Sequence, residues 1–289
     1  MAYDSRRDVV VLFGGNDGAS RGDTWEWDGD RWSLRAISGP TPRSGHAMAY
    51  DSARGVVVLF GGTNGNLPFA DTWEWNGIAW KQRAVQGPPE RYGHAMAYDL
   101  HRGVTVLFGG IQDHFTKILD DTWEWDGDTW SKRTSSQIPF KRWAHAMVYD
   151  SERRVTVVVG GTPSRDTWEW NGSDWISRGF LNGPTHDRFR SAAYDSSRMT
   201  TVVFTEFSGQ SQTWEWDGTS WSLLPIANPP SRGGHSMVFA DEQGSVLMFG
   251  GSTSGIERFN DLWGFDGNSW SENVAEYPQA RTAHALAYD

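Results

Sequence analysis

The sequence predicts an all-β protein, a six-bladed β-propeller of four-stranded antiparallel blades, because one pattern of about 48 residues recurs six times. The clearest marker is one Trp per copy, at Trp25, Trp73, Trp123, Trp168, Trp214 and Trp263. Of the 18 Trp residues, all but Trp143 fall at three positions of the repeat. Units that recur at such a period bury their apolar faces against one another, so the repeat predicts stacked sheets.

The second copy shows how each strand is recognised. Residues 45–51 alternate large and small side chains, which is typical of a strand packed between two sheets. Val56–Phe60 is a continuous apolar run, as in a strand buried on both faces, and Gly61-Gly62 ends it. Beyond a variable loop, residues 71–75 alternate with a period of two. Asn76-Gly77 then predicts a hairpin turn before a fourth strand.

The two ends of the chain predict how the ring closes. Residues 1–4 match the end of a first strand, and residues 281–289 match a complete first strand. We expect 281–289 to become the innermost strand of the first blade, which would remove exposed sheet edges. A single domain is expected, with approximate blade limits at 1–40 plus 281–289, 41–88, 89–139, 140–184, 185–230 and 231–280.

Composition narrows the classes of partner and chemistry. The formal net charge of −10 argues against a nucleic-acid groove or an anionic membrane surface. The chain has no Cys, so thiolate chemistry and Cys-ligated metals are excluded. The sequence contains no membrane-spanning apolar run and no signal-peptide pattern, but it starts inside a repeat, so an upstream segment could be missing and the compartment stays open. Without a nucleophile elbow, a phosphate loop or metal-ligand spacing, we expect no cofactor and no metal.

The repeat resembles the kelch repeat: Gly-Gly closes the second strand, an aromatic residue follows a variable loop, and a Trp follows a turn. The resemblance covers all six copies. Kelch propellers include protein-interaction scaffolds, copper radical oxidases of the galactose oxidase type, sialic acid mutarotases and plant nitrile-specifier proteins. The oxidase activity is excluded, because its cofactor is a Tyr cross-linked to Cys, and the iron-binding loop of the nitrile specifiers has no match. One fold hosts many activities, so the resemblance predicts the fold more strongly than the function.

In kelch propellers, ligands generally bind one face. It is formed by the segments that lead into the first strands and by the loops that join second to third strands; we call it the loop face. The resemblance places one Arg per repeat there, and these ring Arg are the binding candidates Arg43, Arg91, Arg142, Arg188, Arg232 and Arg281. Some kelch interaction domains use Arg here to hold acidic peptides, because bidentate guanidinium donors suit carboxylates. The structural alternative is that each Arg pairs with an acid of its own blade, such as Asp23, Asp71, Asp121, Asp166 or Asp261.

Aromatic residues add a second set of candidates. Tyr92, Trp143 and Phe189 directly follow the ring Arg on three adjacent blades. Together they would form an aromatic wall that suits a sugar, a ring or a peptide side chain. The alternative is that they plug the channel. His114 and Phe115, in one of the longest variable loops, complete the candidate set.

The fifth copy departs from the others in three places. Five copies carry a His in the first strand, and these are His46, His94, His145, His235 and His284. The fifth copy has Arg190 there, Thr205-Glu206 in place of Gly-Gly, and Gln212 in place of the third-strand Asp. These positions share one end of a blade, so we expect His, Gly-Gly and Asp to touch in ordinary blades, with the imidazole against backbone and carboxylate. Glu206 and Arg190 are then a structural replacement pair or, as catalytic candidates, a carboxylate base and its assisting Arg.

Three functions follow from these patterns. The leading one is a monomeric binding or interaction module that takes an anionic or sugar-like small molecule, or a peptide or protein, at the loop face. The alternative is a small-molecule isomerase or lyase that uses Glu206 with Arg190 in a central pocket. A structural protein, or a piece of a larger chain, is the third.

Overall fold

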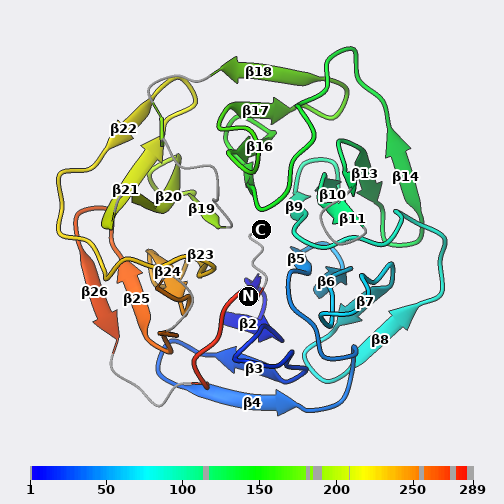
Figure 1. Cartoon of the computed structure of the whole chain (residues 1–289), viewed down its shortest axis with the longest axis horizontal. Coiled ribbons are helices and arrows are strands. Elements are labelled where there is room, and N and C mark those ends of the chain that lie inside the picture. The colour runs from blue at the N-terminus through cyan, green and yellow to red at the C-terminus, as the bar shows by residue number, and fades with distance from the viewer. Residues whose placement is uncertain are drawn as a thin grey trace.

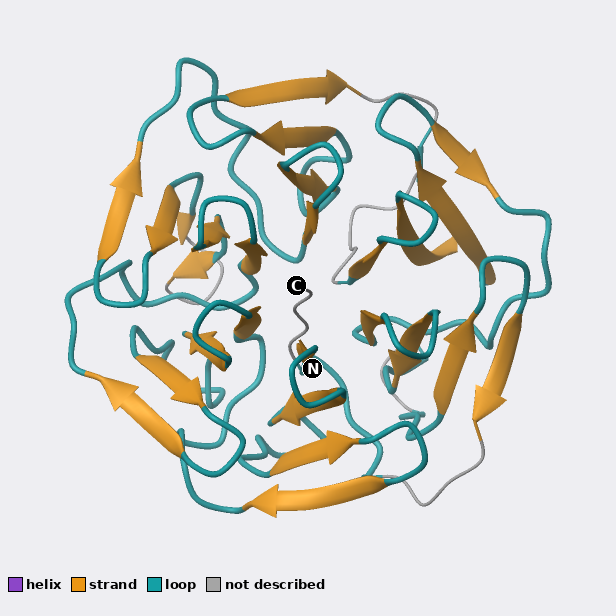
Figure 2. Ribbon diagram, turned by 180° about the vertical axis from the view of Figure 1, so that it is seen from behind, coloured by secondary structure: helices purple, strands orange, loops and turns teal. Residues whose placement is uncertain are grey.

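A computed structural model describes residues 2–112, 117–179, 183–184, 191–207, 209–253, 257–273 and 278–284. Across these ranges the secondary structure is entirely β (Figure 2). Six four-stranded antiparallel sheets stand around a central axis, which confirms the predicted propeller (Figure 1). Nothing in the described part of the chain forms a helix that could cross a membrane.

Each blade is a meander of four consecutive strands, with one small extra hairpin in the third blade. Blades one to three contain β1 (Ala2–Asp4), β2 (Val9–Phe13), β3 (Thr24–Trp27) and β4 (Trp32–Ala36); β5 (Ala47–Asp51), β6 (Val56–Phe60), β7 (Thr72–Trp75) and β8 (Trp80–Arg83); and β9 (Ala95–Asp99), β10 (Val104–Phe108), the hairpin β11 (Ile111–Gln112) and β12 (Lys117–Ile118), β13 (Thr122–Trp125) and β14 (Trp130–Arg133). Blades four to six contain β15 (Ala146–Asp150), β16 (Val155–Val159), β17 (Thr167–Trp170) and β18 (Trp175–Gly179); β19 (Ala192–Asp195), β20 (Thr200–Phe207), β21 (Gln210–Trp216) and β22 (Trp221–Leu223); and β23 (Ser236–Ala240), β24 (Ser245–Phe249), β25 (Leu262–Phe265) and β26 (Trp270–Asn273).

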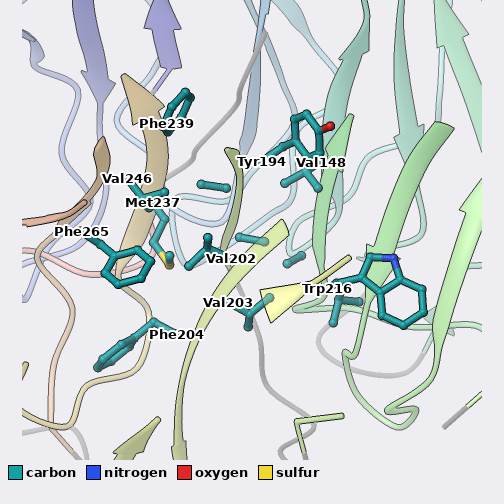
Figure 3. Packing of buried hydrophobic residues seen from close by; sticks show 14 of the residues in the cluster. Val148, Tyr194, Val202, Val203, Phe204, Trp216, Met237, Phe239, Val246 and Phe265 are labelled. Carbon is teal, nitrogen blue, oxygen red and sulfur yellow. The ribbon is translucent and has the colours of Figure 1, made fainter. Parts of the chain in front are cut away.

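The first strand of each blade lies nearest the axis and the fourth lies at the periphery (Figure 1). The second strands are the most apolar and are buried along almost their whole length, because neighbouring blades cover both of their faces. Between blades five and six, Val202 and Phe204 of β20 meet Met237 of β23 in one apolar cluster (Figure 3). The core is therefore a ring of layers between blades, and its burial supplies the main driving force for stacking.

The Gly-Gly pair ends the second strand for a steric reason. Gly61 and Gly62 adopt positive φ angles of 64° and 94°. A Cβ on Gly61 would lie 2.6 Å from the Arg91 carbonyl oxygen, and a Cβ on Gly62 would lie 2.8 Å from His46 Cβ. The fifth blade has Thr205-Glu206 instead, so its ladder continues and β20 and β21 are longer.

The predicted turn between the third and fourth strands is confirmed, but its Asn stabilises the turn through the side chain and not through a positive φ angle. Gly77 has a φ of 89°, whereas Asn76 is not among the residues with positive φ. Its side-chain oxygen instead accepts hydrogen bonds from the backbone N–H groups of Ile78 and Ala79, both at 2.9 Å. The Asn therefore stabilises the turn as a side-chain cap.

Two separate pieces of chain complete the inner edge of blade one. β1 pairs with β2, and the C-terminal segment 281–284 joins the same blade beside it. Thr282 and Asn16 exchange two backbone hydrogen bonds at 2.9 Å, and Arg281 pairs with Asp23. The C-terminal segment thus closes the ring, and the rest of the expected closing strand, 285–289, lies outside the described residues.

Neighbouring blades are also joined by one repeated polar bond. The indole Nε1 of the Trp that opens a fourth strand donates to the Thr hydroxyl that opens the third strand of the preceding blade. Five junctions have this bond, at 2.8 to 3.0 Å, in Trp80–Thr24, Trp130–Thr72, Trp175–Thr122, Trp221–Thr167 and Trp270–Thr213. Between blades six and one, Leu262 replaces the Thr and Trp32 Nε1 is buried without a hydrogen-bond partner. Apolar packing of Leu262 with Trp32 takes the place of the polar bond there.

Candidate functional site

The loop face is built by backbone pairing between its two kinds of segment. Tyr92 N–H donates to the Ile111 carbonyl at 3.1 Å, and Ile111 N–H returns a bond to Tyr92 at 2.9 Å. Trp143 and Thr162 exchange the same two bonds, at 3.2 and 2.9 Å. Tyr92 and Trp143 therefore occupy equivalent positions on adjacent blades, fixed by the main chain.

The next residue along each segment links one blade to another. These residues form what we call the axial belt, namely Gly45, Gly93, Ala144, Gly234 and Ala283, with φ between 53° and 67°. Gly93 N–H donates to Gly45 O at 2.7 Å, and Ala144 N–H donates to Gly93 O at 2.7 Å. Gly45 N–H donates to Ala283 O at 2.8 Å, and Ala283 N–H donates to Gly234 O at 3.0 Å. The belt explains why the first strands begin later than expected: residues such as Gly45 bond sideways to the next blade rather than within their own ladder.

The two aromatic candidates lean over this belt. A Cβ on Gly45 would lie 3.7 Å from Cδ2 of Tyr92, and a Cβ on Gly93 would lie 3.2 Å from Cε3 of Trp143. Each side chain therefore rests on the belt residue of the preceding blade. Both residues are half-buried, so neither is fully covered by the protein. Phe189, the third member of the expected wall, lies outside the described residues.

Unlike the two aromatic residues, the ring Arg lie buried inside their blades. The five that the structure describes are buried and ion-paired, as Arg43–Asp71, Arg91–Asp121, Arg142–Asp166, Arg232–Asp261 and Arg281–Asp23. Arg91 shows the geometry: its two terminal nitrogens donate to the Asp121 carboxylate at 2.7 and 2.9 Å, and one also donates to the Gly109 carbonyl at 2.8 Å. Its side chain is 0 % exposed. These five ring Arg therefore fit the structural alternative, in which each Arg pairs with an acid of its own blade.

The electrostatics of the pairs agree with this role. Burial by itself would raise the pKa of Asp121, but the hydrogen bonds and charge of Arg91 outweigh it and hold the pKa below the ordinary value. The same balance lowers the pKa of Asp71 beside Arg43. Both carboxylates are thus ionised and already bonded, which leaves them unsuited to proton transfer.

The repeated His residues lie between blades. The His94 ring packs edge-on against Phe60 of the preceding blade, with ring centroids 5.6 Å apart, and a Cβ on Gly61 would lie 2.9 Å from its Cε1. Within the blade itself, a Cβ on Gly110 would lie 2.8 Å from His94 Cβ, so the expected contact of His with Gly-Gly is confirmed. The expected contact of the imidazole with the Asp carboxylate is wrong, because Arg91 binds that carboxylate. Burial is the largest cause that lowers the pKa of His94, and the charge of Arg91 adds to it, so the imidazole is neutral.

The catalytic candidates are described only in part. Glu206 is half-buried in β20, opposite Ser211, and its carboxylate accepts the Gly209 N–H at 2.6 Å. Gln212 accepts the indole N–H of Trp214 at 3.1 Å, a bond that Asp makes in other blades. Outside the described residues lie Arg188, Arg190, His114 and Phe115. The Glu206–Arg190 pair stays a prediction, and no three His, Asp or Glu side chains gather into a metal site within the described ranges.

The fifth copy has a different spacing before its first strand. Asp195 pairs with Thr200 at the end of β19, as Asp150 pairs with Val155 at the end of β15. Arg142 lies eight residues before Asp150, whereas Arg188 lies seven residues before Asp195. Residues 185–190 lie outside the described part of the chain, so Arg188 as the sixth ring Arg stays a prediction.

These features define a six-bladed β-propeller whose repeated polar residues hold the blades together and whose loop face carries the variable positions. The "KLHDC2/KLHL20/DRC7 Kelch-repeats domain" family matches residues 1–174. The chain therefore belongs to the kelch-repeat family. A solved structure described as "Structure of YjhT" shares the fold, with a TM-score of 0.66 and 16 % identity over 92 % of this chain and 98 % of that chain. A search of curated proteins found no match to the chain.

Proposed function

We propose that this chain is a kelch binding module that takes its ligand on the loop face, over Tyr92 and Trp143. The observation that carries the proposal is the placement of two half-buried aromatic rings on adjacent blades, each fixed by backbone bonds and resting on the axial belt. A rigid, partly open aromatic surface of this kind suits a sugar ring or an apolar or aromatic peptide side chain.

The ligand class follows from what the ring Arg do. Five of them are committed to Asp partners inside their blades, so a purely anionic ligand finds little support among them. Stacking on Tyr92 and Trp143 is the stronger support, and it favours a carbohydrate-like ligand or a peptide. The isomerase or lyase alternative gains no support from Glu206, whose carboxylate is bonded within its own hairpin.

A thermal-shift screen with uronic acids, sialic acids and peptides tests the proposal, because a ligand that binds only the folded state raises the melting temperature. Tyr92→Ala and Trp143→Ala should abolish the shift given by a hit. Ile78→Ala is the matched control, because Ile78 is exposed in the turn at the opposite end of the blade. A hit whose shift survives both aromatic substitutions would contradict the proposed site.

A further inference from the structure

The strand β8 lies at the periphery of the ring (Figure 1). A second surface lies beside the end of this strand, at the rim of the loop face. It is an open groove of about 780 Å³ between residues 67–71 of the β6–β7 loop and residues 82–86, with Glu90 at its edge. We call it the rim groove. Its volume falls in the range of sites that hold a small ligand or a side chain with its neighbours.

The floor of the rim groove is preformed. Phe69 N–H donates to the Gly62 carbonyl at 2.8 Å, and Arg91 N–H donates to the Phe69 carbonyl at 3.1 Å. The Phe69 ring stacks on the guanidinium of Arg43, with Cζ 4.1 Å from the ring centroid. Arg43 is itself buried and paired, so the aromatic floor has little freedom to move.

Apolar side chains surround this floor. Leu67 is 69 % exposed, and Val85 is half-buried on the other bank of the groove. The loop that carries Leu67 is braced internally, because Asn64 and Thr63 hydrogen-bond to its backbone. An exposed Leu beside a fixed aromatic floor is an arrangement that an apolar side chain of a partner would cover.

Two of the charged side chains that line the groove are paired with groups of opposite charge. Arg83 is compensated by Glu74 and Asp128, at 3.1 and 3.0 Å, and Asp71 is compensated by Arg43. Their fields therefore largely cancel at the groove.

Glu90 is the exception. Its carboxylate accepts one hydrogen bond, from the Gln112 side-chain amide at 3.3 Å, and it forms no ion pair with a described residue. Gln112 is 4 % exposed, and its side-chain oxygen is buried without a hydrogen-bond partner in the described part of the chain. The local charge is negative, like the formal net charge of −10. Charge complementarity therefore favours a cationic group beside Glu90.

We propose that the rim groove binds a segment of a partner protein in which an apolar side chain is followed closely by Lys or Arg. The apolar side chain packs on Phe69 between Leu67 and Val85, and the cation pairs with Glu90. This site is separate from Tyr92 and Trp143, so either site can fail without the other.

A phage-displayed library of random heptapeptides, selected on the intact chain, tests the proposal. Enriched peptides should carry an apolar residue with Lys or Arg within two positions. After synthesis with a fluorescein label, their affinity should fall at least tenfold in Leu67→Asp and in Glu90→Gln, and should be unchanged in Ile78→Ala, because Ile78 is exposed at the opposite end of the blade. Leu67 is mostly exposed, so Leu67→Asp is expected to keep the fold, which a melting curve checks.

Glu90→Lys provides the sharper readout, because a repeat selection should then favour acidic peptides. A merely structural role for Glu90 would not reverse the preference. The proposal is overturned if the enriched peptides bind Leu67→Asp and Glu90→Gln with unchanged affinity. It is also overturned if the unmodified chain selects acidic peptides, or if the selection enriches no peptide. It is also overturned if the chain sediments as a dimer that Leu67→Asp dissociates, because the occupant would then be a second copy.

Discussion

The indole Nε1 of Trp130 donates a hydrogen bond to the hydroxyl of Thr72 at 2.9 Å, although the two residues are 58 apart in the chain and belong to different blades. Both ends of the bond are buried. The same bond recurs at five junctions, and its absence at the sixth makes blades six and one an internal control for its energetic contribution.

Thr72→Val should lower the free energy of unfolding by about 1–3 kcal/mol, because it keeps the shape of the side chain and leaves the Trp130 donor unsatisfied. At the sixth junction the comparison runs in reverse. Leu262→Thr should be more stable than Leu262→Val by about 1 kcal/mol, because only Thr can accept a bond from Trp32. Urea unfolding of the three variants measures both differences, and equal stability of the two position-262 variants would contradict the bond's contribution.

Asp121→Asn should destabilise the fold by about 3–5 kcal/mol, because it leaves the buried guanidinium of Arg91 without its charged partner. Asp17→Asn is the matched control, since Asp17 pairs with the partly exposed Arg21 and should cost about 0–1 kcal/mol. Chemical denaturation compares the two. If both substitutions had the same small effect, the ring pairs would not be the internal struts that their geometry indicates.

Gly62→Ala and Gly65→Ala separate steric contact from backbone strain. The two residues have nearly the same φ, 94° and 93°. A Cβ on Gly62 would lie 2.8 Å from His46 Cβ, whereas a Cβ on Gly65 meets no atom within 4 Å. Gly65→Ala should cost about 1 kcal/mol from strain alone, and Gly62→Ala should cost at least 2 kcal/mol more from the clash. Melting curves of both variants would show equal losses if the contact with His46 were unimportant.

The buried His residues should make the protein acid-sensitive. Burial, aided by the charge of Arg142, lowers the pKa of His145 from 6.5 to about 3. The unfolded chain therefore takes up a proton below pH 6.5 that the folded chain refuses until about pH 3, so stability is lost as pH falls through this window.

The change from pH 7 to pH 5 should cost about 2 kcal/mol for each such imidazole. His145→Gln should reduce the loss of unfolding free energy between these pH values by that amount. His101→Gln, at an exposed turn position, should leave the loss unchanged. An identical pH dependence in the His145 variant would contradict the burial effect.

The sequence predicted the blades well because each strand leaves a local mark. The run Val56–Phe60, the Gly-Gly pair and the Asn-Gly turn all fall within one copy and reflect burial and backbone geometry at their own positions. The sequence does not show in the same way which side chains pair with one another. Nothing local shows that Asp71 binds Arg43 rather than His46, because all three meet at one end of the blade and reach decides between them.

The candidate site shows the same division. Tyr92 and Trp143 could be selected because they differ at one position of a regular repeat. The rim groove could not, since Phe69, Val85 and Glu90 come from separate segments that only the packed blades bring together.

The axial belt has a consequence for how the ring opens. The amide proton of Gly93 is bonded to Gly45 of the neighbouring blade, so it can reach solvent only when blades two and three separate. Its hydrogen-exchange rate therefore reports the parting of a junction rather than the fraying of a strand. The amide proton of Ala283 is bonded to Gly234 and reports in the same way on the junction of blades six and one, where the Trp–Thr bond is missing. The Ala283 proton should exchange before those of Gly93 and Ala144, which would make this junction the place where the propeller begins to unfold.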